Sequence, residues 1–244
     1  LSGMSVFDGI CHTFTALSTG GFSPHDASID YYRITGFSNY ILIEYILIAG
    51  MLMGGINFLV HYRVLRGKFK ALYDNTEMRY WWGLIAAFVL IIFMERLIRV
   101  DGFWKNLETN FRAVLFQVVA ILTTTGFATR DIGGEFFGRV ARQLFLVMMV
   151  IGGCVGSTGG GIKVLRTAIL TKSVWRELFR LRSSNRAITD IIVDGKAVKI
   201  DEVRRVGALF FAWILLLAAG GTLTAASSRW APHPPFSWMF SPPR

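Results

Sequence analysis

The stretch VVAILTTTGFATRDI, residues 118–132, runs from a hydrophobic segment directly into three threonines, a glycine and a phenylalanine. It has a counterpart near the start of the chain, because TALSTGGFSPHD (residues 15–26) aligns without a gap on AILTTTGFATRD (residues 120–131). Five aligned pairs are identical and all are 105 residues apart: Leu17 and Leu122, Thr19 and Thr124, Gly21 and Gly126, Phe22 and Phe127, and Asp26 and Asp131. Such a repeat predicts a fold built from repeated units.

The composition is typical of a membrane protein. Of the 244 residues, 53% are hydrophobic and 17% are charged, whereas soluble domains carry about a quarter charged residues. The hydrophobic residues are gathered in long runs, which indicates membrane segments. These runs are residues 40–60, 80–94, 144–151 and 206–226. We therefore predict an all-α integral membrane protein.

The net charge of +10 would suggest a nucleic-acid ligand in a soluble protein, but in a membrane protein the placement of the charges matters more. Basic residues cluster at 63–79, between the first two long runs, and eleven more lie in residues 163–205. Cytoplasmic loops carry the excess of Lys and Arg, so both regions are expected in the cytoplasm. We expect no nucleic-acid partner, and we expect the threonine–glycine segments near the outer side.

Each threonine–glycine segment follows a short apolar segment, residues 4–17 in the first copy and 111–122 in the second. As helices these would be roughly 20 Å long, too short to cross a hydrocarbon core of about 30 Å. A half-length helix that dips into the membrane and returns as a loop fits this length. Irregular backbone is tolerated at that depth only where protein buries it or water reaches it. The order predicts repeated modules of helix, half-helix, loop and helix, as in a pore.

The long run that ends each copy also repeats, because Gly54 and Gly55 align on Gly152 and Gly153 at a spacing of 98 residues. In the second copy, six of the ten residues 152–161 are glycines. Each glycine costs a helix about 1 kcal/mol, so this run is expected to break into two helices around an irregular intramembrane loop. Discontinuous helices of that kind indicate a transport pathway.

The threonine–glycine segments suit a dehydrated monovalent cation. Backbone carbonyls and threonine hydroxyls replace its water shell without a formal charge that would trap it. The C-terminal ends of the preceding half-helices carry partial negative charge, which favours a cation. The alternative is a plain helix C-cap with a glycine stop, which two copies in the same context make less attractive.

These segments, and above all GGCVGSTGGGIKVLR (residues 152–166), resemble the membrane subunit of Trk/Ktr-type potassium uptake systems, within the Trk/Ktr/HKT superfamily. The resemblance covers residues 1 to about 226. It implies four pore modules around a central filter and an inner-membrane, multi-pass location. The implied potassium-facing residues are Thr19, Gly20, Gly21, Thr124, Thr125 and Gly126, with Ser18, Phe22, Thr123 and Phe127 next to them. The implied gate is Gly152, Gly153, Gly156, Ser157, Thr158, Gly159, Gly160, Gly161 and Lys163.

The resemblance also implies partners. They are the lipid bilayer, a second copy of the chain in a homodimer, and a cytoplasmic nucleotide-binding regulatory ring of the TrkA/KtrA type. The basic segments 63–70 and 172–186 are candidate docking surfaces for that ring, although a solvated positive-inside loop explains them equally well. K⁺ is the transported ion, with no bound cofactor, no other metal and no catalytic residue. Permeation is expected to be passive or coupled to a second cation, as in a symporter.

The expected boundaries place two of four modules in the chain. They are a first pore module at 1–62, a cytoplasmic linker at 63–79, a second pore module with a broken inner helix at 80–171, a linker with a hairpin at 172–205, the first helix of a further module at 206–226, and a proline-rich tail at 227–244. A truncated, non-conducting fragment of such a transporter is therefore the alternative. A nucleotide-binding membrane enzyme is rejected, because Ile162 separates Gly161 from Lys163 and spoils the similarity to a phosphate loop.

Isolated polar residues leave two interpretations open. Glu44 and Asn57 lie within a span, where such residues are functional candidates or simply bond one helix to another. His12 is expected to pack or to make a local hydrogen bond, because no metal-ligand spacing surrounds it. The alternating residues 191–200 around Asp194-Gly195 predict a type I′ hairpin. The two cysteines, Cys11 and Cys154, are expected to be buried thiols rather than a disulfide.

Overall fold

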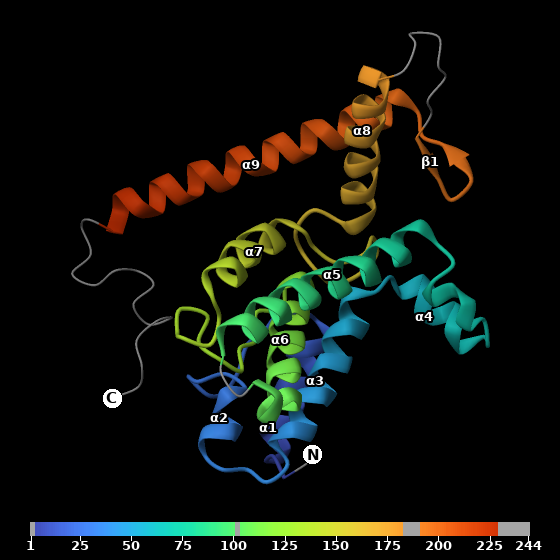
Figure 1. Ribbon diagram of the computed structural model, residues 1–244. Coiled ribbons are helices and arrows are strands. Elements are labelled where there is room, and N and C mark those ends of the chain that lie inside the picture. The colour runs from blue at the N-terminus through green and yellow to red at the C-terminus, as the bar shows by residue number, and fades with distance from the viewer. Residues whose placement is uncertain (1–2, 101–102, 183–190, 229–244) are drawn as a thin grey trace. The chain divides into compact units, whose positions relative to one another are not determined.

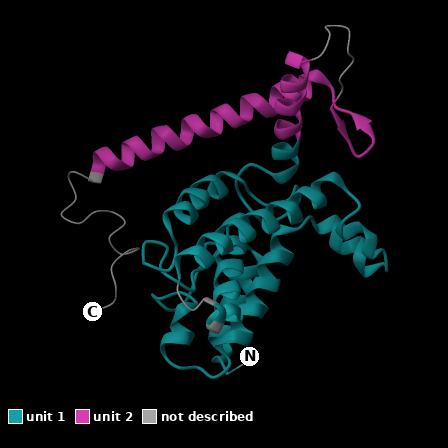
Figure 2. Cartoon of the chain, in the orientation of Figure 1, with its two compact units in different colours: residues 1–168 teal, residues 169–244 magenta. Residues whose placement is uncertain are grey.

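The fold comes from a computed structural model, which describes residues 3–100, 103–182 and 191–228. The chain divides into two compact units, residues 1–168 and 169–244 (Figure 2). The described residues are mostly helical, as expected. In chain order the elements are α1 (Val6–Leu17), α2 (Asp30–Ile34), α3 (Tyr40–Gly55), α4 (Phe58–Leu65), η1 (Phe69–Leu72), α5 (Thr76–Arg99), η2 (Phe103–Asn106), α6 (Leu107–Leu122), α7 (Arg139–Val150), α8 (Val164–Arg182), β1 (Ile192–Val193), β2 (Lys196–Ala197) and α9 (Ile200–Ser228) (Figure 1).

The two half-length helices end where the sequence predicts, α1 at Leu17 and α6 at Leu122. α1 begins after Ser5, whose hydroxyl accepts a hydrogen bond from the backbone N–H of Asp8 at 3.0 Å. α6 begins at Leu107, four residues before the expected start, because its polar first turn extends the helix beyond the apolar run. At 1.5 Å per residue the helices are roughly 18 and 24 Å long.

α6 is the central helix of the first unit and packs against α3, α5 and α7. One set of its side chains, which includes Val114, Val118 and Leu122, joins a buried cluster with residues of α5 and α7. Another set, Phe116, Val119 and Ala120, joins a second cluster with residues of α1 and α3. A helix that is apolar all round belongs in the interior, so α6 holds both clusters together.

The expected descending helix at 40–60 is not continuous, because the run is divided into two helices. α3 ends at Gly55, and α4 starts at Phe58 at an angle of 107° to it. The side chain of Asn57 accepts a hydrogen bond from the N–H of Leu59 at 2.8 Å and so caps α4. Asn57 is therefore the residue that begins a new helix after the bend.

Three element boundaries differ from the sequence-based expectation. α5 begins at Thr76, inside the predicted linker 63–79, and the linker also contains α4's last turn and the short helix η1. α8 continues to Arg182, well past residue 171 where the second module was expected to end. For α8 the added residues include several charged ones with good helix propensity, which extend the helix beyond the apolar run. The predicted tail lies outside the described residues from 229 onwards.

The glycine-rich run breaks the chain between two helices, as predicted. α7 ends at Val150, α8 begins at Val164, and the residues between them form irregular backbone. The ends of this loop are held together where Ile151 and Ile162 form an isolated bridge, with Gly152 N–H donating to the carbonyl of Ile162 at 2.9 Å. The two ends of the loop, residues 151–152 and 160–162, are thus held side by side, and we call this part the neck of the loop.

The second unit contains the predicted hairpin. β1 pairs with β2 in an antiparallel manner, and Asp194 and Gly195 both have positive φ, at 48° and 76°. That pair of dihedrals is the signature of a type I′ turn, so the prediction is confirmed. Helix α9 follows at Ile200 and includes the predicted apolar run 206–226.

Two described helices, Thr76–Arg99 and the helix from Ile200, are long and apolar enough to cross a bilayer. The bent pair α3 and α4 makes a third if it counts as one span. Most of the apolar surface of α9 is exposed in this chain. Such a surface requires lipid or protein contact.

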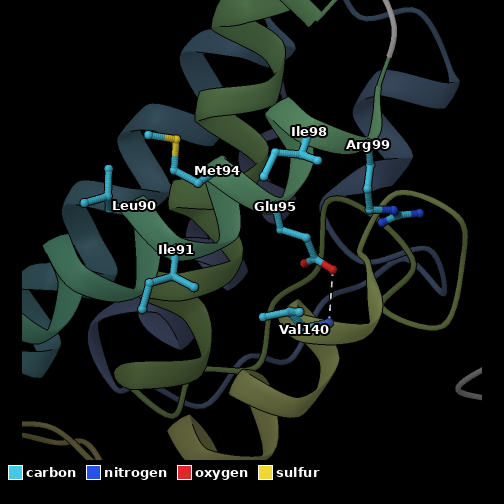
Figure 3. A pocket seen from close by; sticks show the side chains of 7 residues that line it. All are labelled: Leu90, Ile91, Met94, Glu95, Ile98, Arg99 and Val140. Atoms are coloured by element: carbon cyan, nitrogen blue, oxygen red, sulfur yellow. Dashed lines mark hydrogen bonds between the residues drawn. The ribbon is translucent and has the colours of Figure 1, made fainter.

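A glutamate fixes the start of α7 against α5. The carboxylate of Glu95 accepts a hydrogen bond from the N–H of Val140 at 3.0 Å (Figure 3). It accepts another from the N–H of Ala141 at 2.8 Å. It satisfies two donors that a helix N-terminus leaves unpaired. Beside it lies a largely apolar cavity of about 490 Å³, lined by Leu90, Ile91, Met94, Glu95, Ile98, Arg99 and Val140.

A buried ion pair joins α3 to α6. Arg112 Nε lies 2.6 Å from Glu44 Oε2, and both side chains are almost fully buried. Arg112 also pairs with Glu108 one turn earlier and lies 5.3 Å from the ring centre of Tyr40. Glu44 is therefore a helix–helix contact, the second of the two interpretations that its position in a span allowed.

Removing one partner of this pair should be far more costly than removing both. Glu44→Ala leaves the Arg112 guanidinium buried against Glu108 alone, and we expect a loss of about 3–5 kcal/mol in stability. Glu44→Leu combined with Arg112→Met should lose much less, because no charge is then stranded. Thermal unfolding in detergent measures both.

The partly exposed pair Arg176–Glu177, whose glutamate side chain is 56% exposed, supplies the control. Glu177→Ala should change stability by less than about 1 kcal/mol. Additive losses from Glu44→Leu and Arg112→Met would contradict the account, since they would show that the two side chains do not interact.

Candidate functional site

The two half-helices end in the same hydrogen-bond pattern. After α1, the N–H groups of Thr19 and Gly20 donate to the carbonyls of Ala16 at 3.2 Å and Thr15 at 2.8 Å. After α6, the N–H groups of Thr124 and Thr125 donate to Ile121 and Ala120, each at 2.9 Å. This is a Schellman cap, repeated at the spacing of 105 residues.

The caps use an unusual residue at the left-handed position. Thr19 has φ 53° and Thr124 has φ 59°, although glycine is the normal residue there. A β-branched residue with positive φ is strained, and such strain of about 1–3 kcal/mol concentrates at functional sites. The C-cap alternative from the sequence is thus correct in its geometry, but the strained residue is threonine rather than the glycine.

A second positive φ follows two residues later in each copy, at Gly21 (68°) and Gly126 (84°). Gly20 and Thr125, which lie between, do not take positive φ. In ordinary extended backbone successive carbonyls point to opposite sides, whereas alternation in the sign of φ turns them towards the same side. Both segments thus have a backbone suited to presenting several oxygens in one direction.

The two segments lie against each other. A Cβ atom on Gly21 would overlap the carbonyl oxygen of Thr125, so no side chain fits at that position. The loops that follow are also joined, because Asp30 N–H donates to the Ala128 carbonyl at 3.2 Å and Arg130 Nη1 lies 3.2 Å from Asp30 Oδ1. The structure therefore brings the segments around Gly21 and Gly126 together from opposite halves of the repeat.

Asp30 is a residue that sequence reasoning missed. Besides Arg130 it binds Arg33 at 2.6 Å. Burial raises the pKa of the Asp30 carboxyl, and its bonds to Arg33 oppose that shift. Its carboxylate is the acceptor that ties the loop after the first segment to the loop after the second.

The repeat is not symmetric at its phenylalanines. Phe127 is fully buried, whereas the side chain of Phe22 is 78% exposed. The ring of His12 packs near the buried Phe127, with the two ring centres 5.8 Å apart. Its two nitrogens bind the Asp8 carbonyl at 2.8 Å and the Ser23 hydroxyl at 3.1 Å, as expected for a local role.

The hydroxyls at the helix ends are bound within the protein. Thr123 Oγ1 donates to the Val119 carbonyl at 2.7 Å and also lies 2.7 Å from Thr125 Oγ1. Thr19 Oγ1 bonds to the Ser18 carbonyl at 2.7 Å. Ser18 and Thr123 are the C-cap residues of α1 and α6, directly before the two left-handed threonines.

The glycine-rich loop 151–163 contacts the ends of both half-helices. Thr158 Oγ1 lies 3.0 Å from the carbonyl of Leu17, the last residue of α1, and 3.2 Å from Thr19 Oγ1. Gly160 N–H donates to Thr124 Oγ1 at 2.7 Å. A hydroxyl and an amide of the loop thus reach the two left-handed threonines.

The same loop is anchored on the end of α3. Cys154 N–H donates to the Gly55 carbonyl at 2.9 Å. The Gly54 carbonyl accepts two bonds from Thr158, one from its hydroxyl at 3.0 Å and one from its backbone N–H at 3.2 Å. A Cβ on Gly152 would collide with backbone of Gly160 across the neck. The glycines are therefore needed because backbones approach closely, in addition to breaking the helix.

Lys163 and Glu77 stabilise the two sides of the loop. Lys163 Nζ donates to the carbonyl of Gly159, inside the loop. Glu77 Oε1, on the buried first turn of α5, accepts from Val155 N–H at 2.6 Å. Ser157 Oγ donates to the Cys154 carbonyl at 2.6 Å. Within the described residues no group of His, Cys, Asp and Glu is arranged to hold a metal.

A family model described as "TrkH: Cation transport protein" matches residues 1–227. The chain belongs to the TrkH family of cation transport proteins. The Trk system potassium uptake protein TrkH of Escherichia coli (strain K12) is 33% identical over 216 residues, covering 88% of this chain and 42% of that protein. TrkG of the same strain is 35% identical over 216 residues with the same coverage.

A solved relative has the same fold. The crystal structure of the potassium transporter TrkH from Vibrio parahaemolyticus superposes with a TM-score of 0.79 at 31% identity, covering 97% of this chain and 48% of that chain. The chain therefore spans less than half the length of these relatives. The match supports an all-α membrane fold for the TrkH-family chain.

Because the two segments are in contact at Gly21 and not at Gly126, we expect substitution of the two glycines to cost different amounts of stability. Gly21→Ala combines a positive φ with a collision against the Thr125 carbonyl, so it should destabilise the protein by about 2–4 kcal/mol. Gly126→Ala meets nothing within 4 Å and carries only the backbone strain of about 1 kcal/mol. Thermal unfolding of the two variants in detergent compares them, and equal losses would contradict the observed packing.

Proposed function

We propose that the chain carries potassium ions across the inner membrane, with residues 19–21 and 124–126 lining the path. The support with most weight is the repeated cap, in which a strained threonine and a following glycine of positive φ recur at both half-helix ends. Backbone carbonyls turned to one side can replace the ion's water shell. The Trk relatives, which are named potassium uptake proteins, indicate which ion.

Helix electrostatics support a cation in this place. α1 and α6 both end at these segments, so the partial negative charge at the C-terminus of each helix lies beside the proposed path. Arg112 is the only cation within α6, and Glu44 and Glu108 neutralise it. The second half-helix thus approaches the path without an uncompensated positive charge.

A closed ring of ligands needs more than the two segments found among the described residues. Two copies in a homodimer would provide four, the number that the resemblance implies. We propose α8, whose basic residues fall in the expected docking segment 172–186, as the contact for a nucleotide-binding regulatory ring. Residues 183–186 of that segment lie outside the described part of the chain.

The uptake proposal is tested in cells that lack their own potassium uptake. Expression of the chain should restore growth at low potassium and permit uptake of the potassium analogue Rb⁺. Gly126→Ser should reduce the preference for Rb⁺ over Na⁺ severalfold, because a side chain at this position enters the ring of carbonyls. Growth that is not restored would favour a non-conducting fragment, and unchanged selectivity would exclude Gly126 from the filter.

We further propose that the glycine-rich loop is the gate and that Thr158 holds it shut. Its hydroxyl lies 3.0 Å from the carbonyls of both Leu17 and Gly54, so its single proton is shared between two helix ends. Opening of the loop would release the Leu17 carbonyl, which then becomes available to water or a passing ion. Glycines in the neck permit such a movement at small steric cost.

Thr158→Val keeps the side-chain shape and removes the hydroxyl. A hydrogen bond contributes about 0.5–1.5 kcal/mol, so the open population and the basal Rb⁺ uptake should rise about two- to tenfold. Thr158→Ser keeps the hydroxyl and should behave as the unmodified chain does. If Thr158→Val left basal uptake unchanged at equal protein levels, Thr158 would not be a closing contact.

A further inference from the structure

A second cavity, of about 640 Å³, lies away from the proposed ion path, at the junction between α4, η1 and the start of α5. It is lined by Arg63, Gly67, Lys68, Phe69, Lys70, Ala71, Tyr73, Asp74 and Asn75. Three of these side chains are cationic and one is a carboxylate. None of the ion pairs found among the described residues involves Arg63, Lys68 or Lys70.

The cavity lies at the end of a membrane span. α5 is a candidate span that begins at Thr76, directly after the cavity-lining Asn75. Aromatic residues collect at this level, with Tyr80 and Trp82 in the first turns of α5 and Tyr73 in the cavity wall. Trp82 Nε1 donates to the Leu72 carbonyl at 2.8 Å and attaches η1 to the helix. Such belts mark the depth of lipid headgroups.

α4 is suited to lie in the plane of that interface. It leaves α3 at 107°, and Figure 1 shows it projecting from the helices of the first unit. Phe58, Tyr62 and Leu65, spaced at four and three residues, are 56%, 50% and 86% exposed and form one apolar face. Val60, on another side of the helix, is buried in the core. An exposed apolar face flanked by cations is typical of an interfacial helix.

We propose that this cavity binds the headgroup of an anionic phospholipid, with the acyl chains against the apolar face of α4. Three cations that form no ion pair with other described residues suit a phosphate, and the adjacent apolar face suits the chains of the same molecule. A soluble acidic protein would match the charge but would leave Phe58, Tyr62 and Leu65 uncovered. The positive end of the α5 dipole beside Asn75 favours the same anion.

Binding of this lipid would connect the bend after Gly55 to the glycine-rich loop. α3 ends at Gly54 and Gly55, whose carbonyls accept bonds from the glycine-rich loop. α4 begins two residues later and, through Phe58 N–H, donates to the Gly156 carbonyl at 3.1 Å. A lipid that anchors α4 would thereby stabilise the hydrogen bond between Phe58 and Gly156 of the loop. The lipid site itself does not depend on which ion the protein carries.

The test is a titration of the purified chain in non-ionic detergent with phosphatidylglycerol or phosphatidylcholine, with bound lipid counted by native mass spectrometry. Phosphatidylglycerol should bind more tightly. The triple variant Arg63→Gln, Lys68→Gln and Lys70→Gln should lose at least about tenfold in affinity, since each cation near a headgroup contributes severalfold. Asp74→Asn should act in the opposite direction and strengthen binding, because it removes the only carboxylate in the cavity wall.

The matched control removes three cations from α8, as Arg176→Gln, Arg180→Gln and Arg182→Gln, and should retain phosphatidylglycerol binding. All these side chains are outside the core, so size-exclusion profiles should stay unchanged. Equal loss in both triples would show general charge attraction and overturn the site. Equal binding of both lipids, or displacement of phosphatidylglycerol by an equal concentration of glycerol phosphate, would overturn the lipid assignment as well.

Discussion

The structure depends on how two short helices end inside the protein. α1 and α6 stop at Leu17 and Leu122, and the chain leaves each of them through a left-handed threonine. The last carbonyls of a helix have no partner within it; the two caps bind several of them, and the carbonyl of Leu17 is bound by Thr158 of the glycine-rich loop. Those oxygens need either a hydrogen-bond donor or a cation. The proposed function assigns the carbonyl of Leu17 to water or the cation when the path is open and to the loop's Thr158 when it is closed.

The rest of the first unit keeps these helix ends in place. From Arg112 to Leu122, α6 is mostly buried between two hydrophobic clusters, and Arg112 is fixed by Glu44 on α3. The glycine-rich loop then contacts the ends of α1, α3 and α6 mainly through hydrogen bonds made by its backbone and by the hydroxyl of Thr158. A loop held mainly by hydrogen bonds can change partners at low energetic cost, whereas the packed core around α6 cannot.

Much of this arrangement follows from sequence alone. Segment length predicts the two half-helices, and identical residues at a fixed spacing of 105 predict their equivalence, because both can be read directly from the order of residues. The glycine count at 152–161 likewise predicted the break. The bend after Gly55 was missed, because residues 40–60 are apolar throughout and a change in helix direction leaves no trace in hydrophobicity. Arg112 and Asp30 were missed because their partners lie 68 and 100 residues away, and a single sequence holds no record of such pairs. The left-handed threonines could not be inferred either, since propensity favours glycine there.

The most direct measurement is the position of a heavy monovalent cation in the protein. Crystals grown with Tl⁺, which substitutes for K⁺ and gives a strong anomalous signal, would locate it. The account predicts a peak beside the carbonyls of residues 19–21 and 124–126, coordinated by both segments at once. A Tl⁺ peak elsewhere, with these carbonyls bound only to protein donors, would contradict the claim that the two helix ends form an ion path.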